Sequence, residues 1–174
     1  MLISKKMADS INQQVGREFG AMLQYVAIAS HFAAESLPEL SAFFYAQAED
    51  ERTHAMRFVK YVVDAGGRSA IPAIAAPKCE FASAEEAVRK SLDWETEVTG
   101  QINTIVKQAI DESDYTTHSF LQWFINEQLE EVSTMQTLLD IVRRAGEDRI
   151  LHVEEYLSRR GGHKAISTSV EAPA

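Results

Sequence analysis

The sequence predicts an all-α protein, a four-helix bundle with a long crossover between helices two and three and a short fifth helix. Four stretches of roughly 28–30 residues repeat apolar side chains every three or four positions, which places those side chains on one face of a helix. The connections between the stretches are short, long and short. That order is typical of a bundle with a single crossover.

The first two helices are predicted from about residue 6 to residue 35 and from about residue 38 to residue 65. Pro38 cannot continue the first helix, but it fits the first turn of the next one. Gly66 and Gly67 then stop the second helix. Because the break around Pro38 is short, the two helices are expected to be antiparallel.

Residues 66–83 carry two prolines and two glycines without a helical period, which indicates an extended connection. Ser83, followed three residues later by Glu86, matches a capping box at the start of a third helix. That helix is predicted over about residues 84–112. The connection is long enough to carry the chain along the whole bundle.

The fourth helix is predicted over about residues 116–145, and Gly146 ends it. A short amphipathic helix follows, over about residues 148–159. Its apolar face, which we expect to need a partner surface outside the bundle, comprises Ile150, Val153 and Leu157.

Composition narrows the class of protein. The 174 residues, 45% hydrophobic and 25% charged, predict one domain over residues 1–160 with a polar tail over residues 161–174. The net charge of −9 argues against nucleic acid as a partner. There is no signal-peptide pattern and no apolar run near the ~18 residues that span a membrane, so we expect a cytoplasmic protein without a membrane partner. The single cysteine, Cys79, excludes an internal disulfide.

All four apolar stripes are interrupted by polar residues near mid-helix. Since mid-helix positions of an up-and-down bundle meet at about one level, the sequence predicts four carboxylates and one imidazole in a single buried layer. The interrupting residues are Glu18 in helix one, Gln47, Glu51 and His54 in helix two, Glu95 in helix three, and Gln128 and Glu131 in helix four.

A lone glutamate on such a stripe is usually misphased or extends to solvent, and a lone core histidine is usually hydrogen-bonded. The coincidence on four helices, with no lysine or arginine at these positions, favours a metal site, because burying each uncompensated carboxylate costs several kcal/mol. Two divalent cations would neutralise four carboxylates. Oxygen-rich ligation with one imidazole suits iron or manganese rather than structural zinc. Glu51 and His54 then form a Glu-x-x-His motif of a dimetal site.

Three stretches, "REFGAMLQYVAIA", "AEDERTHAM" and "FLQWFINEQLEEV", resemble the signature stretches of the ferritin family, specifically the bacterial non-haem ferritins. The resemblance covers about residues 4–160. It implies a ferritin-like bundle and a homo-oligomeric shell of 24 subunits that stores ferric mineral. It also implies ferroxidase activity, the oxidation of Fe²⁺ by O₂ or H₂O₂ at a di-iron centre inside each bundle.

The resemblance assigns ligands residue by residue. Glu18, Glu51 and His54 are similar to the ligands of the first iron site. Glu51 would also bridge to a second iron, bound by Glu95 and Glu131.

Two further residues are assigned catalytic roles by the resemblance. Gln128 is similar to the glutamine that hydrogen-bonds near this centre. Tyr25 is similar to a tyrosine that lies beside the irons and can supply an electron, although a core phenol with a satisfied hydroxyl is an equal alternative.

A third iron site is expected beside the centre. Glu127, Glu130 and Asp50 lie about one residue off the buried stripes of helices four and two, and bacterial ferritins of this type have such a site built from glutamates. Glu131 would be shared with it. Asp50 is one methylene shorter than a glutamate, so binding should be weaker or water-mediated. The alternative is a solvated acidic edge.

The departures from related families are also informative. The second metal motif is "QLEE", without the histidine of bacterioferritin, and Arg52 occupies the position of the haem-binding methionine. We therefore expect iron and no haem. Two other functions stay open, a di-iron oxygenase or oxidase acting on an organic substrate, and a structural shell like the mini-ferritins that bind DNA.

Overall fold

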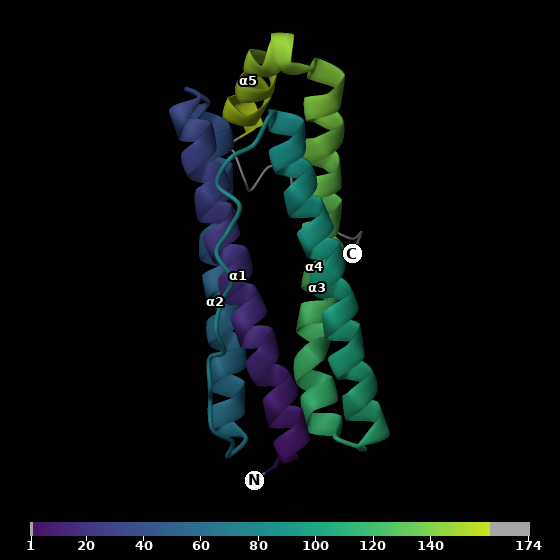
Figure 1. Cartoon of the computed structure of the whole chain (residues 1–174). Coiled ribbons are helices and arrows are strands. Elements are labelled where there is room, and N and C mark those ends of the chain that lie inside the picture. Colours follow the sequence, from purple (N-terminus) through teal and green to yellow (C-terminus); the bar gives the residue numbers. More distant parts are fainter. Residues whose placement is uncertain (1, 161–174) are drawn as a thin grey trace.

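The computed structural model describes residues 2–160 and confirms the all-α prediction (Figure 1). The predicted tail over residues 161–174 lies outside the described residues. No helix of the described part is long and apolar enough to cross a membrane. The helices are α1 (Lys5–Ala34), α2 (Pro38–Asp64), α3 (Ala84–Asp111), α4 (Tyr115–Ala145), the 3-10 turn η1 (Glu147–Arg149) and α5 (Ile150–Arg160).

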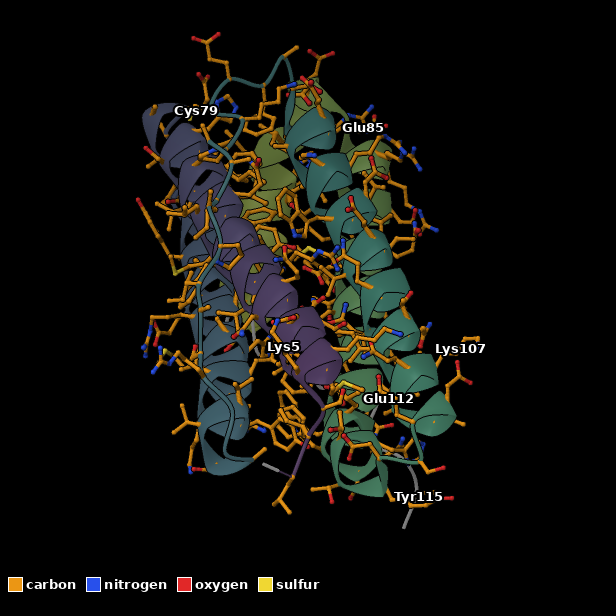
Figure 2. The ribbon with its side chains drawn as sticks, turned by 60° about the horizontal axis from the view of Figure 1, so that its bottom comes forward. Lys5, Cys79, Glu85, Lys107, Glu112 and Tyr115 are labelled. Atoms are coloured by element: carbon orange, nitrogen blue, oxygen red, sulfur yellow. The ribbon has the colours of Figure 1, made fainter. Side chains whose placement is uncertain are left out.

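The four long helices run as two antiparallel pairs, α1 with α2 and α3 with α4, and the crossover that joins the pairs runs along the bundle beside α1 (Figure 1). The start of α1 lies at the same end as the end of α3, where Lys5 and Glu112 are neighbours in Figure 2. The Ser4 hydroxyl donates a hydrogen bond to the Glu112 carboxylate there at 2.6 Å. Cys79 and Glu85 lie toward the opposite end (Figure 2).

Both short turns close in the same way. At the end of α1, the Leu37 N–H bonds to the Phe32 carbonyl at 2.9 Å, and Ser36 between them adopts a left-handed conformation with φ of 60°. At the end of α3, Ser113 takes the corresponding position with φ of 54°. These compact turns bring each helix back against its predecessor, which makes the pairs antiparallel.

The start of α2 is capped from a distant part of the chain. Pro38 occupies the first helical position, as predicted. The Glu154 carboxylate, which belongs to α5, accepts the Glu39 and Leu40 N–H groups at 2.8 Å each. A buried acid at a helix N-terminus satisfies donors that the helix itself cannot, so α5 and α2 stabilise one another.

The expectation that the fifth helix needs an external partner was wrong for its main apolar residues. Val153 and Leu157 are fully buried within the same chain, packed at the end of the bundle with residues such as Leu37 and Leu40. Ile150 is partly buried there as well. The sequence pattern identified the apolar face correctly, but only the direction of the chain after Gly146 decides that this face folds back onto its own bundle.

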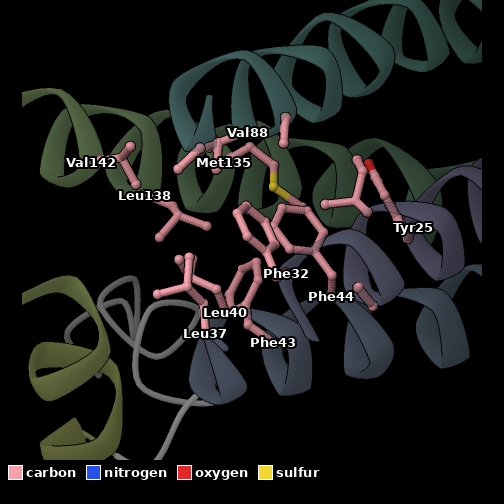
Figure 3. Packing of buried hydrophobic residues seen from close by; sticks show 14 of the residues in the cluster. Tyr25, Phe32, Leu37, Leu40, Phe43, Phe44, Val88, Met135, Leu138 and Val142 are labelled. Atoms are coloured by element: carbon pink, nitrogen blue, oxygen red, sulfur yellow. The ribbon is translucent and has the colours of Figure 1, made fainter. Parts of the chain in front are cut away.

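The core is divided into two apolar clusters. One, the α5-end cluster, contains Phe32 of α1 stacked on Phe44 of α2 at 5.6 Å, with Met135 and Leu138 of α4 nearby (Figure 3). The other, the opposite-end cluster, includes residues such as Met7, Ile11, Phe58, Ile102 and Phe124. The polar layer predicted from the sequence lies between them.

The crossover is fixed to α1 by two buried amides. Asn12 donates to the Arg68 carbonyl and accepts the Ala70 N–H, each at 3.0 Å. Gln24, three turns later, donates to the Lys78 carbonyl at 2.8 Å and accepts the Lys78 N–H at 3.0 Å. Each amide therefore bonds the crossover backbone in both directions, as a neighbouring strand would.

Two glycines, Gly16 and Gly20, lie between these amides on α1, so that a residue facing the crossover recurs every four positions from Asn12 to Gln24. They form a shallow groove for the crossover. A Cβ atom on Gly16 would lie 2.3 Å from Cγ of Pro72, and one on Gly20 would lie 3.3 Å from the Trp94 ring. The α1 surface is thus shaped for the crossover.

We predict that Gly16→Ala destabilises the protein by about 1–3 kcal/mol, because the added methyl group overlaps Pro72 in a packed interface. Gly100→Ala is the matched control: Gly100 is also helical, but its added Cβ meets nothing within 4 Å. That control should gain about 0.5–1 kcal/mol from helix propensity. Thermal unfolding of both variants checks this, and equal midpoints would show that the crossover does not pack on Gly16.

Candidate metal centre

The centre consists of polar side chains that occupy the boundary between the two apolar clusters. On α1, Glu18 lies between Val15 of the opposite-end cluster and Ala21 of the α5-end cluster, and the other helices repeat this arrangement. All the side chains concerned are at most 6% exposed: Glu18, Gln47, Glu51, His54, Glu95, Gln128 and Glu131. The helices thus place them at one level, as the sequence predicted.

Glu18, Glu51 and His54 form a group in which one ligand atom from each lies within 4.8 Å of the others. Glu51 and His54 are one turn apart on α2, and the His54 Nδ1 lies 3.4 Å from the Glu51 Oε2. Glu18 reaches them from α1. The arrangement is that of a three-ligand cation site made by two neighbouring helices.

Glu95 is held in place by two donors. The Tyr25 hydroxyl donates a hydrogen bond to Oε1 of Glu95. The Gln128 amide donates to Oε2 at 3.2 Å. Tyr25 and Gln128, the two residues assigned catalytic roles, therefore both contact the carboxylate that α3 contributes. Glu95 itself belongs to neither of the compact ligand groups of the described residues.

A second compact group consists of His54, Glu127 and Glu131. The Glu127 Oε1 lies 3.7 Å from the His54 Nε2, and the Glu127 side chain is 28% exposed. Glu127 therefore connects the buried imidazole with the surface, whereas the sequence placed it only on the flank of the centre.

The other two residues of the expected third site lie farther out. Glu130 is exposed and belongs to neither group. Asp50 is partly buried, and its charge contributes to raising the pKa of Glu131. The structure thus brings Asp50 and Glu127 near the centre and leaves Glu130 on the surface.

Three carboxyl groups of the layer, those of Glu51, Glu95 and Glu131, have pKa values raised above the ordinary value of a glutamate. Burial raises the pKa of Glu131 to about 8, and repulsion from Glu95 adds to this. Burial also raises the pKa of Glu95 to about 7, although hydrogen bonds from Tyr25 and Gln128 oppose the rise. The pKa of Glu51 is raised well above its usual value, by burial first and by its acidic neighbours second.

Burial shifts the pKa of the His54 imidazole in the opposite direction from the pKa of the carboxyl groups. Burial by itself would lower the pKa of His54, but the surrounding acids, Glu127 first, raise it above its ordinary value. Within residues 2–160 none of the layer's glutamates forms an ion pair with lysine or arginine. Among the described side chains, His54 is therefore the one basic group that faces these acids.

These observations fit divalent cations. Buried, mutually repelling carboxylates with raised pKa values are sites where a cation can replace protons. The donor set is oxygen-rich with one imidazole nitrogen, which suits a first-row metal such as iron or manganese. Two sets of ligand atoms are already close together, that of Glu18, Glu51 and His54 and that of His54, Glu127 and Glu131.

Sequence analysis missed two residues of the centre. Gln14 is fully buried on α1 and donates to the Glu18 Oε1 at 2.8 Å. Trp123 packs its ring edge-on to His54, with 5.5 Å between ring centroids. Gln14 could have been found, since it lies one turn before Glu18 on the same buried face. Trp123 lies off the α4 stripe, so only the packed structure places it there.

The raised pKa values predict how the metal-free protein responds to pH. Glu95 and Glu131 titrate near pH 7 and 8 when folded but near 4.5 when unfolded, so the folded state binds more protons between pH 4.5 and 8. Stability should therefore fall as pH rises from 5 to 8. Added Co²⁺ should restore more stability at pH 8 than at pH 5.

Thermal unfolding of the metal-free protein at several pH values, with and without Co²⁺, measures this. Glu131→Gln should flatten the pH dependence because it removes a titrating group. Glu130→Gln, its exposed neighbour, should leave the dependence unchanged. A stability that rises over this range in the wild-type protein would contradict the prediction.

Comparison with known proteins gives the family. A family model described as a ferritin-like domain matches residues 8–145. Ferritin BfrB of Mycolicibacterium smegmatis is 43% identical over 150 residues, which cover 86% of this chain and 82% of that protein. A bacterial non-heme ferritin of Staphylococcus epidermidis is 36% identical over 147 residues, covering 84% and 89%.

Solved structures agree. A novel open pore ferritin from the archaeon Archaeoglobus fulgidus superimposes with a TM-score of 0.88 at 32% identity, covering 91% of this chain and 98% of that one. These comparisons confirm the resemblance to the ferritin family that the three sequence stretches indicated. The chain belongs to the ferritin family.

Proposed function

We propose that this protein stores iron and is a ferroxidase, which oxidises Fe²⁺ with O₂ at the buried layer and deposits Fe³⁺ as mineral inside a cytoplasmic shell of 24 subunits. The observation that carries the proposal is the set of buried carboxylates from all four helices, uncompensated by lysine or arginine. Membership of the ferritin family supports the storage role.

Each residue of the layer has a role in this proposal. Glu18, Glu51 and His54 bind the first Fe²⁺, and Glu51 is shared with a second Fe²⁺ bound by Glu95 and Glu131. Two Fe²⁺ ions give up two electrons, which together with two protons reduce O₂ to H₂O₂. The apolar clusters above and below exclude bulk water from this step.

Tyr25 and Gln128 act on Glu95. The hydrogen bonds from their hydroxyl and amide groups orient the carboxylate toward the second iron. The pKa of Tyr25 is raised well above its ordinary value by burial and then by Glu95, so the phenol keeps its proton at rest. A protonated phenol beside the centre can supply an electron and pass its proton to Glu95.

A third iron position is proposed next to Glu127. Its carboxylate faces both His54 and the solvent, so it can transfer Fe³⁺ from the centre toward the mineral. Asp50 and Glu130 would complete this position, Asp50 from α2 and Glu130 from the surface of α4.

Haem is not part of the proposal, since Arg52 pairs with the exposed Glu49 at the surface.

An oxidase acting on an organic substrate has less support. Five cavities of the described surface lie at the ends of the bundle, in the grooves between α1 and α3, or along the start of α1. None of them is lined by a residue of the buried layer. These five cavities therefore offer an organic substrate no place beside the acids of the layer.

Glu51→Ala should remove the fast phase of iron oxidation, because it takes one ligand from both iron positions. Stopped-flow absorbance on mixing Fe²⁺ with oxygenated protein measures the rate, and size exclusion shows whether iron migrates with the shell. Glu49→Ala, an exposed acid on the same helix, is the matched control and should oxidise iron at the wild-type rate. Wild-type rates in Glu51→Ala would refute the centre.

Removing Glu127 and Glu130 together should leave the first oxidation of two irons per chain nearly intact, since neither is a ligand of the di-iron centre in the proposal. The iron-to-oxygen ratio and the rate of later additions should change. Single variants separate the two residues, and Glu127→Ala should account for most of the change because only Glu127 reaches His54. Successive additions at wild-type rates would leave these acids without a role in transfer.

A further inference from the structure

Gln14 is a buried amide that the proposed chemistry does not use. It lies on α1 one turn before Glu18, and its side chain is fully buried. Its Nε2 donates a hydrogen bond of 2.8 Å to Oε1 of Glu18.

The orientation of the Gln14 amide is fixed from both sides. A carboxylate can only accept, so the NH₂ group must face Glu18. The amide oxygen then faces outward and accepts a bond of 3.5 Å from Nη1 of Arg17. Arg17 is exposed and lines the groove between α1 and α3. A chain of donors thus runs from a surface guanidinium through a buried amide to a carboxylate of the centre.

We propose that Gln14 is a positioning residue that sets how Glu18 binds its cation. With Oε1 engaged by Gln14, the carboxylate presents its other oxygen to Glu51 and His54, and binds the first metal through a single oxygen. This rests on the proposed function, in which Glu18 is a ligand.

A comparison of Glu18 with Glu95 supports this role for Gln14. Glu95 is steered by two donors, Tyr25 and Gln128. For Glu18, the corresponding donor is the Gln14 amide. Outer partners of this kind orient metal ligands, and losing one typically weakens metal binding by about 10–100-fold. The effect should be confined to the first metal position, because Gln14 donates its hydrogen bond to Glu18, which binds only that metal in the proposed function.

The test uses Co²⁺ as the probe, titrated into the metal-free assembled protein and followed by its visible absorption. Gln14→Met keeps the length and burial of the side chain and removes the donor. The first site should weaken by about 10–100-fold, while the second site stays unchanged. The visible absorption of Co²⁺ in the first site should also weaken. Without Gln14, Glu18 can bind Co²⁺ through both oxygens, which raises the coordination number of the metal.

Gln24→Met is the matched control. Gln24 is another buried amide on α1 that makes two hydrogen bonds, but both are to the backbone of Lys78 in the crossover and neither is to an acid of the layer. This variant should lose stability and keep the wild-type affinity and spectrum for Co²⁺. A Gln24→Met variant that weakens the first site as much as Gln14→Met would overturn the positioning role.

Gln14→Asn is the second variant, in case Gln14→Met does not assemble. Asparagine keeps a polar group but is too short to reach Glu18, so the same loss at the first site is expected. Wild-type Co²⁺ binding in either variant, or equal weakening of both sites, overturns the inference. A wild-type protein that fails to bind two Co²⁺ per chain would instead contradict the proposed function.

Discussion

The burial of four carboxylates at one level of the bundle is the constraint on which the rest of the structure depends. Glu18, Glu51, Glu95 and Glu131 come from four different helices and are almost fully buried. Burial and repulsion between the acids raise the pKa values of Glu51, Glu95 and Glu131, which favours protonated carboxyl groups in the metal-free layer. Such a layer is costly unless cations occupy it, so the two apolar clusters must supply the stability that keeps the helices in register.

The apolar clusters and the crossover both keep the helices in register, but through different contacts. The α5-end cluster is closed by α5, which Glu154 attaches to the start of α2. The crossover is fastened to α1 by the amides of Asn12 and Gln24. Since α1 is packed on both α2 and the crossover, the position of Glu18 is determined from several directions. This rigidity allows a single hydrogen bond from Gln14 to orient it.

The centre is asymmetric. On one side, His54 and Glu127 lead from the buried layer to a partly exposed acid. On the other, Gln14 leads to the exposed Arg17. The acidic side suits the movement of cations, and the guanidinium repels them. In the proposed function, a cation would bind on the α1 side and its oxidised product would leave past α4.

The sequence by itself determined the helices to within a few residues, because helical periodicity and capping are local. It also determined the level of the polar layer and the identity of its acids, because a charged residue interrupts an apolar stripe visibly. It missed Gln14 and Trp123 as neighbours of the centre, and it placed Glu127 and Glu130 together. Only the tertiary structure separates these two acids and turns α5 back onto its own bundle. The physical reason is that side-chain contacts between helices depend on helix rotation and axial register, which a single stripe does not encode.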